Sequence, residues 1–169
     1  MKTNWIKQTL LAGLAVLGLM AGQAVYAQTT SATVDVTAVV PKACRFFTAS
    51  SSMTIEHSGG LIDPTSGSNA TGSTTLNYRC MTGINPLFNI DSDVGGPASP
   101  KTVTVVLTDG GTNNMNADIT VTATGGAGTG LGGGQDKIAT VSGLIAPLDF
   151  QAAAPATYTK TVTIDITAQ

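Results

Sequence analysis

The stretch Ser31-Ala-Thr-Val-Asp-Val-Thr-Ala-Val-Val-Pro-Lys-Ala-Cys44 carries the pattern that decides the predicted fold. Its small or branched apolar residues alternate with polar ones, a period of two that is typical of a strand burying one face. The apolar face consists of Ala32, Val34, Val36, Ala38 and Val40. This stretch therefore predicts a strand that needs a sheet to cover its apolar side.

A secretory signal peptide is predicted directly before this strand, in residues 1–27. Lys2 and Lys7 form a short basic region, an apolar run covers residues 9–22, and Val25-Tyr26-Ala27 fits a cleavage site with small residues. The apolar run is shorter than the roughly 20 residues that cross a bilayer, and an uncleaved anchor is the alternative interpretation. We therefore leave this segment out of the fold prediction.

The exported part of the chain has the length and composition of one all-β domain. Threonine, glycine, alanine, serine and valine dominate, and Glu56 is the only glutamate, so helix-forming residues are scarce. All ten acidic residues lie after residue 27 but only six of the eight lysines and arginines do, which gives a net charge of −4. The absence of a basic patch argues against a nucleic-acid partner.

The chain has two cysteines, Cys44 and Cys80. Export to an oxidising compartment predicts a disulfide between them. In the chain-entropy model, closing a loop of this length stabilises the fold by up to about 4 kcal/mol. A shared metal ion is the alternative, although His57 is the only histidine and no further cysteine could complete a ligand set.

After Cys44 the sequence predicts short strands separated by turns and no helix. The alternating sets lie in residues 74–80, 88–90, 103–107, 119–123 and 157–167. Asp109-Gly110-Gly111 is a strong turn signal, and glycine-rich residues 125–134 predict a loop. Regularly spaced short strands indicate an immunoglobulin-like β-sandwich.

The closing strand predicts an incomplete sandwich. Tyr158, Val162, Ile164 and Ile166 share one face, and only two residues follow the strand. If this is the penultimate strand, the last one is missing and an apolar groove stays open beside an unpaired edge, which favours aggregation unless something fills it. The alternating strand at the other end of the chain, supplied by a neighbouring copy, is the candidate.

Three groups of residues share a further pattern. They are residues 33–40 ahead of Cys44, residues 63–64 and 70–76 leading into Cys80, and residues 145–147 followed by 156–164. Together they resemble the pilins of the chaperone-usher pathway, most closely the archaic, Csu-type branch that includes the spore coat protein U family. The chain departs from that branch in a reduced Gly60-Leu-Ile-Asp63-Pro64 motif and a final Ala-Gln in place of an aromatic residue. Residues 95–134 match no feature of the family.

The resemblance implies a fold, a function and partners. Residues 28–41 would be an N-terminal donor-strand extension and residues 42–169 a pilin domain completed by donor-strand exchange. A periplasmic chaperone would lend a strand, and an outer-membrane usher would exchange it for the extension of the next, identical or related, subunit. The product would be a surface pilus, or fimbria, for adhesion and biofilm formation. The donated face would be Ala32, Val34, Val36, Ala38 and Val40, and the acceptor groove would comprise Tyr158, Val162, Ile164 and Ile166.

Other interpretations stay open at this point. Residues 31–40 could be the first strand of their own domain, and the protein a monomeric secreted module that binds carbohydrate or another surface. The lone His57 is expected at the surface, and Asp91-Ser-Asp93 as a plain turn without the rest of a calcium loop. We expect no catalytic residues, no metal and no cofactor, because no set of acid, base and nucleophile stands out.

Overall fold

The computed structural model describes residues 33–48, 50–57, 60–93 and 95–169. The predicted signal peptide and Ala32 of the predicted donor face lie outside the described residues. The chain divides into two units, residues 1–39 and Val40–Gln169. All helices and strands of the described residues belong to the second unit.

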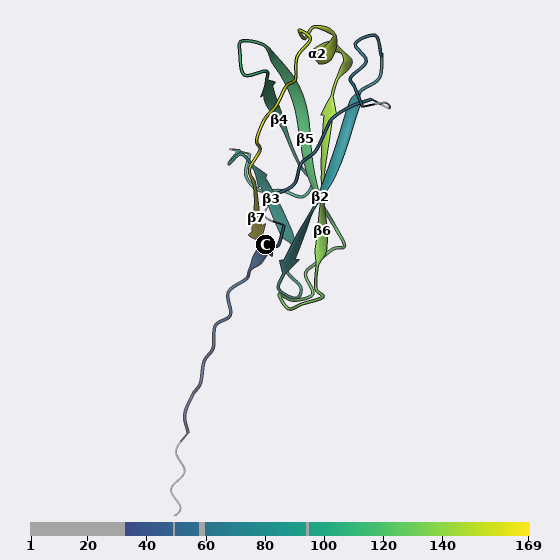
Figure 1. The fold of residues 1–169 in the computed structure, drawn as a ribbon. Helices are drawn as coiled ribbons and strands as arrows, with labels where there is room; N and C mark the ends of the chain where they lie inside the picture. Colours follow the sequence, from purple (N-terminus) through teal and green to yellow (C-terminus); the bar gives the residue numbers. More distant parts are fainter. Residues whose placement is uncertain (1–32, 49, 58–59, 94) are drawn as a thin grey trace, which may run out of the picture. The chain divides into compact units, whose positions relative to one another are not determined.

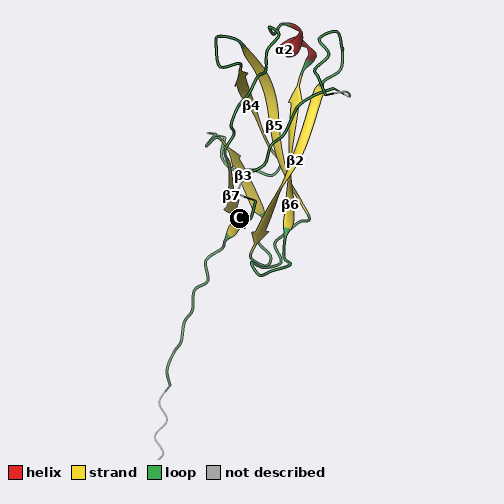
Figure 2. Cartoon of the chain, viewed as in Figure 1, coloured by secondary structure: helices red, strands yellow, loops and turns green. Residues whose placement is uncertain are grey.

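The described residues are almost entirely β-structure, which confirms the predicted all-β class (Figure 2). The elements are β1 (Cys44–Phe46), β2 (Ala70–Cys80), β3 (Pro86–Ile90), β4 (Lys101–Thr108), β5 (Asn114–Thr124), β6 (Lys137–Ile145), α2 (Pro147–Gln151) and β7 (Ile164–Ala168). The expectation of no helix is wrong for α2. This helix begins with Pro147, whose missing N–H is harmless in a first turn, and packs the buried Phe150 onto the core.

The strands form two antiparallel sheets (Figure 1). One has five strands in the order β1-β2-β6-β5-β4, and the other contains β3 and β7. Along β2, β5 and β6 buried residues alternate with more exposed ones, as the period of two in the sequence predicts.

The core lies between the facing sides of the two sheets. Tyr78 of β2 packs edge-on against Phe88 of β3, with ring centroids 5.9 Å apart, and Phe46 of β1 stacks on Phe88 at 6.2 Å. Aliphatic side chains of β4, β5 and β6 complete the same cluster. Because Tyr78, Phe88 and Ile90 are fully buried, their removal from water is a main source of stability.

Two paired glycines let an irregular segment lie on the five-stranded sheet. Gly72 of β2 and Gly143 of β6 are direct neighbours in the ladder. A Cβ atom at Gly72 would overlap the carbonyl oxygen of Thr54, and one at Gly143 would lie 2.5 Å from Cδ1 of Ile55. Side chains at these two positions would therefore push residues 53–55 off the sheet.

The predicted closing strand is shorter than expected. Residues 157–163 make one isolated bridge, between Thr159 and Thr108, and regular pairing begins only at Ile164. The alternation of residues 158–162 is compatible with a strand. Among these residues, however, only Thr159 forms backbone hydrogen bonds, with Thr108. The closing strand is therefore β7, five residues long.

Candidate functional site: the open edge of β7

β7 has a strand neighbour on one side only, within the described residues. The backbone N–H and C=O of Phe88 on β3 both form hydrogen bonds with Ala98. Phe88 and Ile166 are therefore opposite each other in the β3–β7 ladder without exchanging a backbone hydrogen bond. In an antiparallel ladder such pairs alternate with hydrogen-bonded ones. Ile164 and Ile166 therefore direct their N–H and C=O groups away from β3.

The same residues turn their side chains toward the core. Ile164 and Ile166 are half-buried and pack on the core cluster, whereas Asp165 and Thr167 are exposed. Tyr158 and Val162, which precede β7, also pack on that cluster. Tyr158, Val162, Ile164 and Ile166 thus all pack on one core cluster and are each partly exposed, but only Ile164 and Ile166 lie on β7. Beside Ile164 and Ile166 runs an edge that can accept another strand.

β1 lies beside β7 at this edge of the core. It is the outermost strand of the five-stranded sheet, and Cα atoms of β1 and β7 approach within 8 Å. No backbone hydrogen bond joins the two strands in the part of the chain that the structure describes. Two edge strands with unused backbone groups therefore border the same part of the core.

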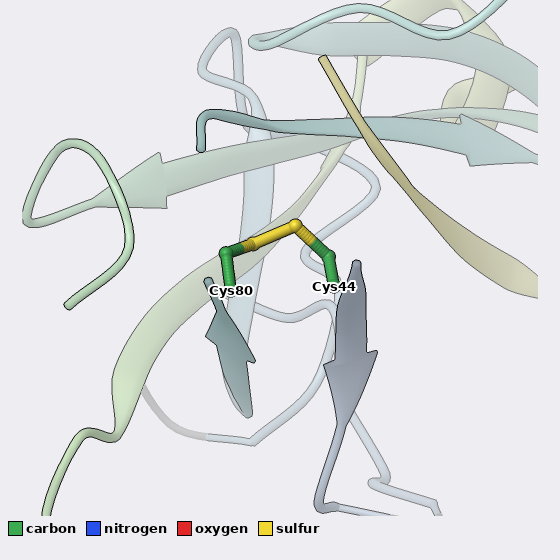
Figure 3. Close-up of a disulfide and its surroundings, with 2 residues drawn as sticks. All are labelled: Cys44 and Cys80. Atoms are coloured by element: carbon green, nitrogen blue, oxygen red, sulfur yellow. A yellow bond between two sulfur atoms is a disulfide. The ribbon is translucent and has the colours of Figure 1, made fainter. Parts of the chain in front are cut away.

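A disulfide between Cys44 and Cys80 fixes β1 to β2, as predicted (Figure 3). The two residues are opposite each other in the ladder, with Cα atoms 4.1 Å apart. Hydrogen bonds from Met81 N–H to Ala43 O and from Phe47 N–H to Asn77 O place them at a close, non-hydrogen-bonded position. The bond therefore holds a strand of only three residues against the sheet.

The outer side of β1 and β2 carries a cluster that the sequence analysis missed. Arg45 and Arg79 are direct neighbours across the strands, and their guanidinium carbons lie 4.6 and 4.0 Å from the ring centroid of Phe47. Asp136 forms a salt bridge with Arg79 at 2.7 Å, and the hydrogen bonds from Arg79 lower the pKa of that carboxyl. Arg45 makes no salt bridge in the described residues and donates one 3.5 Å hydrogen bond to Leu131 O. Only the pairing of β1 with β2 brings these distant residues together.

The N-terminal segment, described by itself, has no strand in residues 33–43. Val34, Val36 and Val40 of the predicted donor face are 81%, 88% and 71% exposed, and Ala38 is exposed as well. Val39, on the opposite parity, is 86% exposed as well. In an extended strand Val34, Val36 and Val40 would share one apolar face.

His57 is partly exposed and makes structural contacts in the loop before β2. Its ring is partly buried and packs edge-on against Phe150 at 5.3 Å. Nδ1 accepts a 3.0 Å hydrogen bond from the N–H of Asp63, so Nε2 carries the proton and donates to Ser68 O at 2.9 Å. The imidazole therefore ties together the loop before β2.

The remaining sequence predictions concern turns and ligands. Asp91 and Ser92 form a tight turn with φ angles of 49° and 54°, as expected. Residues 125–134 form a loop, also as expected, and Gly128 packs beside the turn between β2 and β3. The described residues contain no cluster of three or more potential metal ligands and no helix suited to cross a membrane.

Comparison of the chain with protein-family models, with curated proteins and with solved structures gives no match.

Proposed function

We propose that the protein is a structural subunit of a surface pilus that polymerises by donor-strand complementation. Its domain would be an immunoglobulin-like sandwich that lacks the last strand, and β7 would be the penultimate one. The observation that carries this proposal is the β7 edge, where Ile164 and Ile166 offer both half-buried side chains and unused backbone groups.

The N-terminal segment supplies a strand of matching character. Val34, Val36 and Val40 lie on one face, and burial of each would contribute about 1.5 kcal/mol or more. Each new ladder hydrogen bond would add about 1 kcal/mol. In the proposed fibre, a neighbouring copy is the partner that would bury these valines.

Assembly by this route requires helpers and export. The predicted signal peptide would direct the chain to the periplasm, where a chaperone would cover the β7 edge until an outer-membrane usher exchanges it for the next extension. The finished fibre would stand on the cell surface and support adhesion and biofilm formation. Neither an enzymatic step nor a cofactor has a part in this mechanism.

The proposal is tested by filling the edge in cis. A copy of residues 28–41, joined after Gln169 through a flexible linker long enough to reach the edge, should give a soluble monomer with a clearly higher melting temperature. The matched control carries Val36→Asp in the added copy and should lose the gain, because an unpaired carboxylate would be buried. Equal melting temperatures for the extended and unextended monomers would show that the domain was already complete.

The alternative function is a monomeric binding module. The described residues include an open hollow of about 320 Å³. It is lined by Asn85, Pro86, Leu87, Ser99, Ala123, Gly126 and Gln169. Failure of the cis-complemented variant to gain stability would favour this alternative.

A further inference from the structure

The apolar pattern of the extension does not by itself define how far the extension enters the next subunit. Side chains alternate with a period of two, so a shift by two residues keeps alanines and valines on the buried face. Such a shift would place Ala32 at the position of Val34, or Ala38 at the position of Val36, at modest cost. A unique register needs a polar contact, in the way that a single polar residue sets the register of some coiled coils. This argument rests on the proposed function.

Asp35 is the only charged residue in residues 28–41. It lies between Val34 and Val36, so it faces outward whenever both valines face the core. The Cα atoms of β1 and β7 approach within 8 Å, so the two strands would move apart to roughly 10 Å to admit a strand between them. The Asp35 carboxylate would then lie in the same layer as the outer side chains of these two flanking strands.

Those two strands present opposite charges on that layer. β1 offers Arg45, which is exposed, held in place on the ring of Phe47 and without a carboxylate partner in the described residues. β7 offers Asp165, whose exposed carboxylate would repel Asp35 if the two were directly opposed. Arg79 is already neutralised by Asp136.

We propose that Arg45 binds the Asp35 carboxylate of the neighbouring copy, and that this ion pair sets the register of the inserted extension. A shift by two residues would move Asp35 by about 7 Å, away from Arg45. Asp35 and Arg45 therefore attract each other in one register only. A register that places Asp35 directly opposite Asp165 is disfavoured, because the two carboxylates repel each other.

The experiment is a charge swap in the full chain, expressed in its native host. Polymers of Asp35→Arg, Arg45→Asp and the double variant are compared by their dissociation rate in detergent without boiling. Each single reversal should speed dissociation by about fivefold or more, and the double variant should recover most of the loss. In 1 M salt the differences should shrink, because the pair is exposed.

Two controls make each outcome informative. Lys160→Asp, on the chain leading into β7, should not rescue Asp35→Arg, and a rescue would assign the contact to Lys160 and overturn the proposal. Wild-type dissociation rates in both single variants would also overturn the proposed ion pair. In that case the proposed function would still stand if the wild-type protein forms polymers and the Val36→Asp variant forms none. The absence of polymers in the wild-type protein would overturn both.

Discussion

The fold depends at the scale of single residues on two glycines whose missing side chains make room for the chain. Gly72 and Gly143 form a direct cross-strand pair, and residues 53–55 lie over them. The two positions differ in what surrounds them. A backbone carbonyl lies above Gly72, whereas the movable ends of the Ile55 and Met53 side chains lie above Gly143.

This difference predicts an order of stability for three alanine variants. Gly72→Ala should destabilise the domain by about 1–3 kcal/mol, because a backbone segment must move, and Gly143→Ala should cost less. Gly67→Ala is the matched control, since no atom lies within 4 Å of its added Cβ, and should be neutral or slightly stabilising. Urea unfolding of the three variants checks this order. Equal losses for Gly72→Ala and Gly67→Ala would contradict it.

At the scale of elements, the two faces of β7 should respond in opposite ways to the same added charge. Ile164→Asp would place a carboxylate on the half-buried side, which should cost several kcal/mol and reduce both stability and assembly. Thr167→Asp adds the same charge to the exposed side of the same strand and should change stability by about 0.5 kcal/mol or less. Melting temperature and polymer yield are the two measurements. Normal accumulation and assembly of Ile164→Asp would place the acceptor elsewhere.

Much of the element order could be read from alternation, because most of the strands bury only one face. Leu76, Tyr78 and Cys80 are all buried on β2, as their spacing predicts. The helix α2 could not be predicted from the sequence, because five residues starting at Pro147 show no helical period and no capping side chain. Residues 157–163 alternate like a strand, yet alternation cannot reveal whether a backbone partner exists.

The candidate site was predictable only in part, for the same physical reason. The common face of Ile164 and Ile166 follows from their spacing. The direction of their N–H and C=O groups, however, depends on which strand pairs with β7 and in which register. Arg45 and Arg79 are neighbours only because Cys44 is aligned with Cys80. Tertiary pairing, which no local pattern contains, created that cluster.

At the scale of the whole molecule, three carboxyl groups predict loss of stability in acid. Hydrogen bonds from Thr65 lower the pKa of Asp63, those from Asn113 and Gly111 lower that of Asp109, and those from Arg79 lower that of Asp136. A lowered folded-state pKa stabilises the fold above the unfolded value of about 3.9. This contribution is lost as the pH falls through the lowered values.

Urea unfolding at pH 7 and pH 3 measures this dependence. The unfolding free energy should fall toward pH 3, and Asp136→Asn should show a smaller fall because one titrating group is gone. An unfolding free energy that rises toward pH 3 would contradict the prediction.

The position of the disulfide has a mechanical consequence for a fibre built as proposed. Only residues 42 and 43 separate the proposed extension from Cys44, so tension along the fibre would enter each subunit close to the disulfide. From Cys44 the covalent bond passes the force to Cys80, the last residue of β2, which is paired with β6 from Ala70 to Tyr78. The pull would then act along the length of that ladder and shear many hydrogen bonds at once. The three-residue β1 would be spared from peeling away, so the subunit would resist stretching through its longest pair of strands.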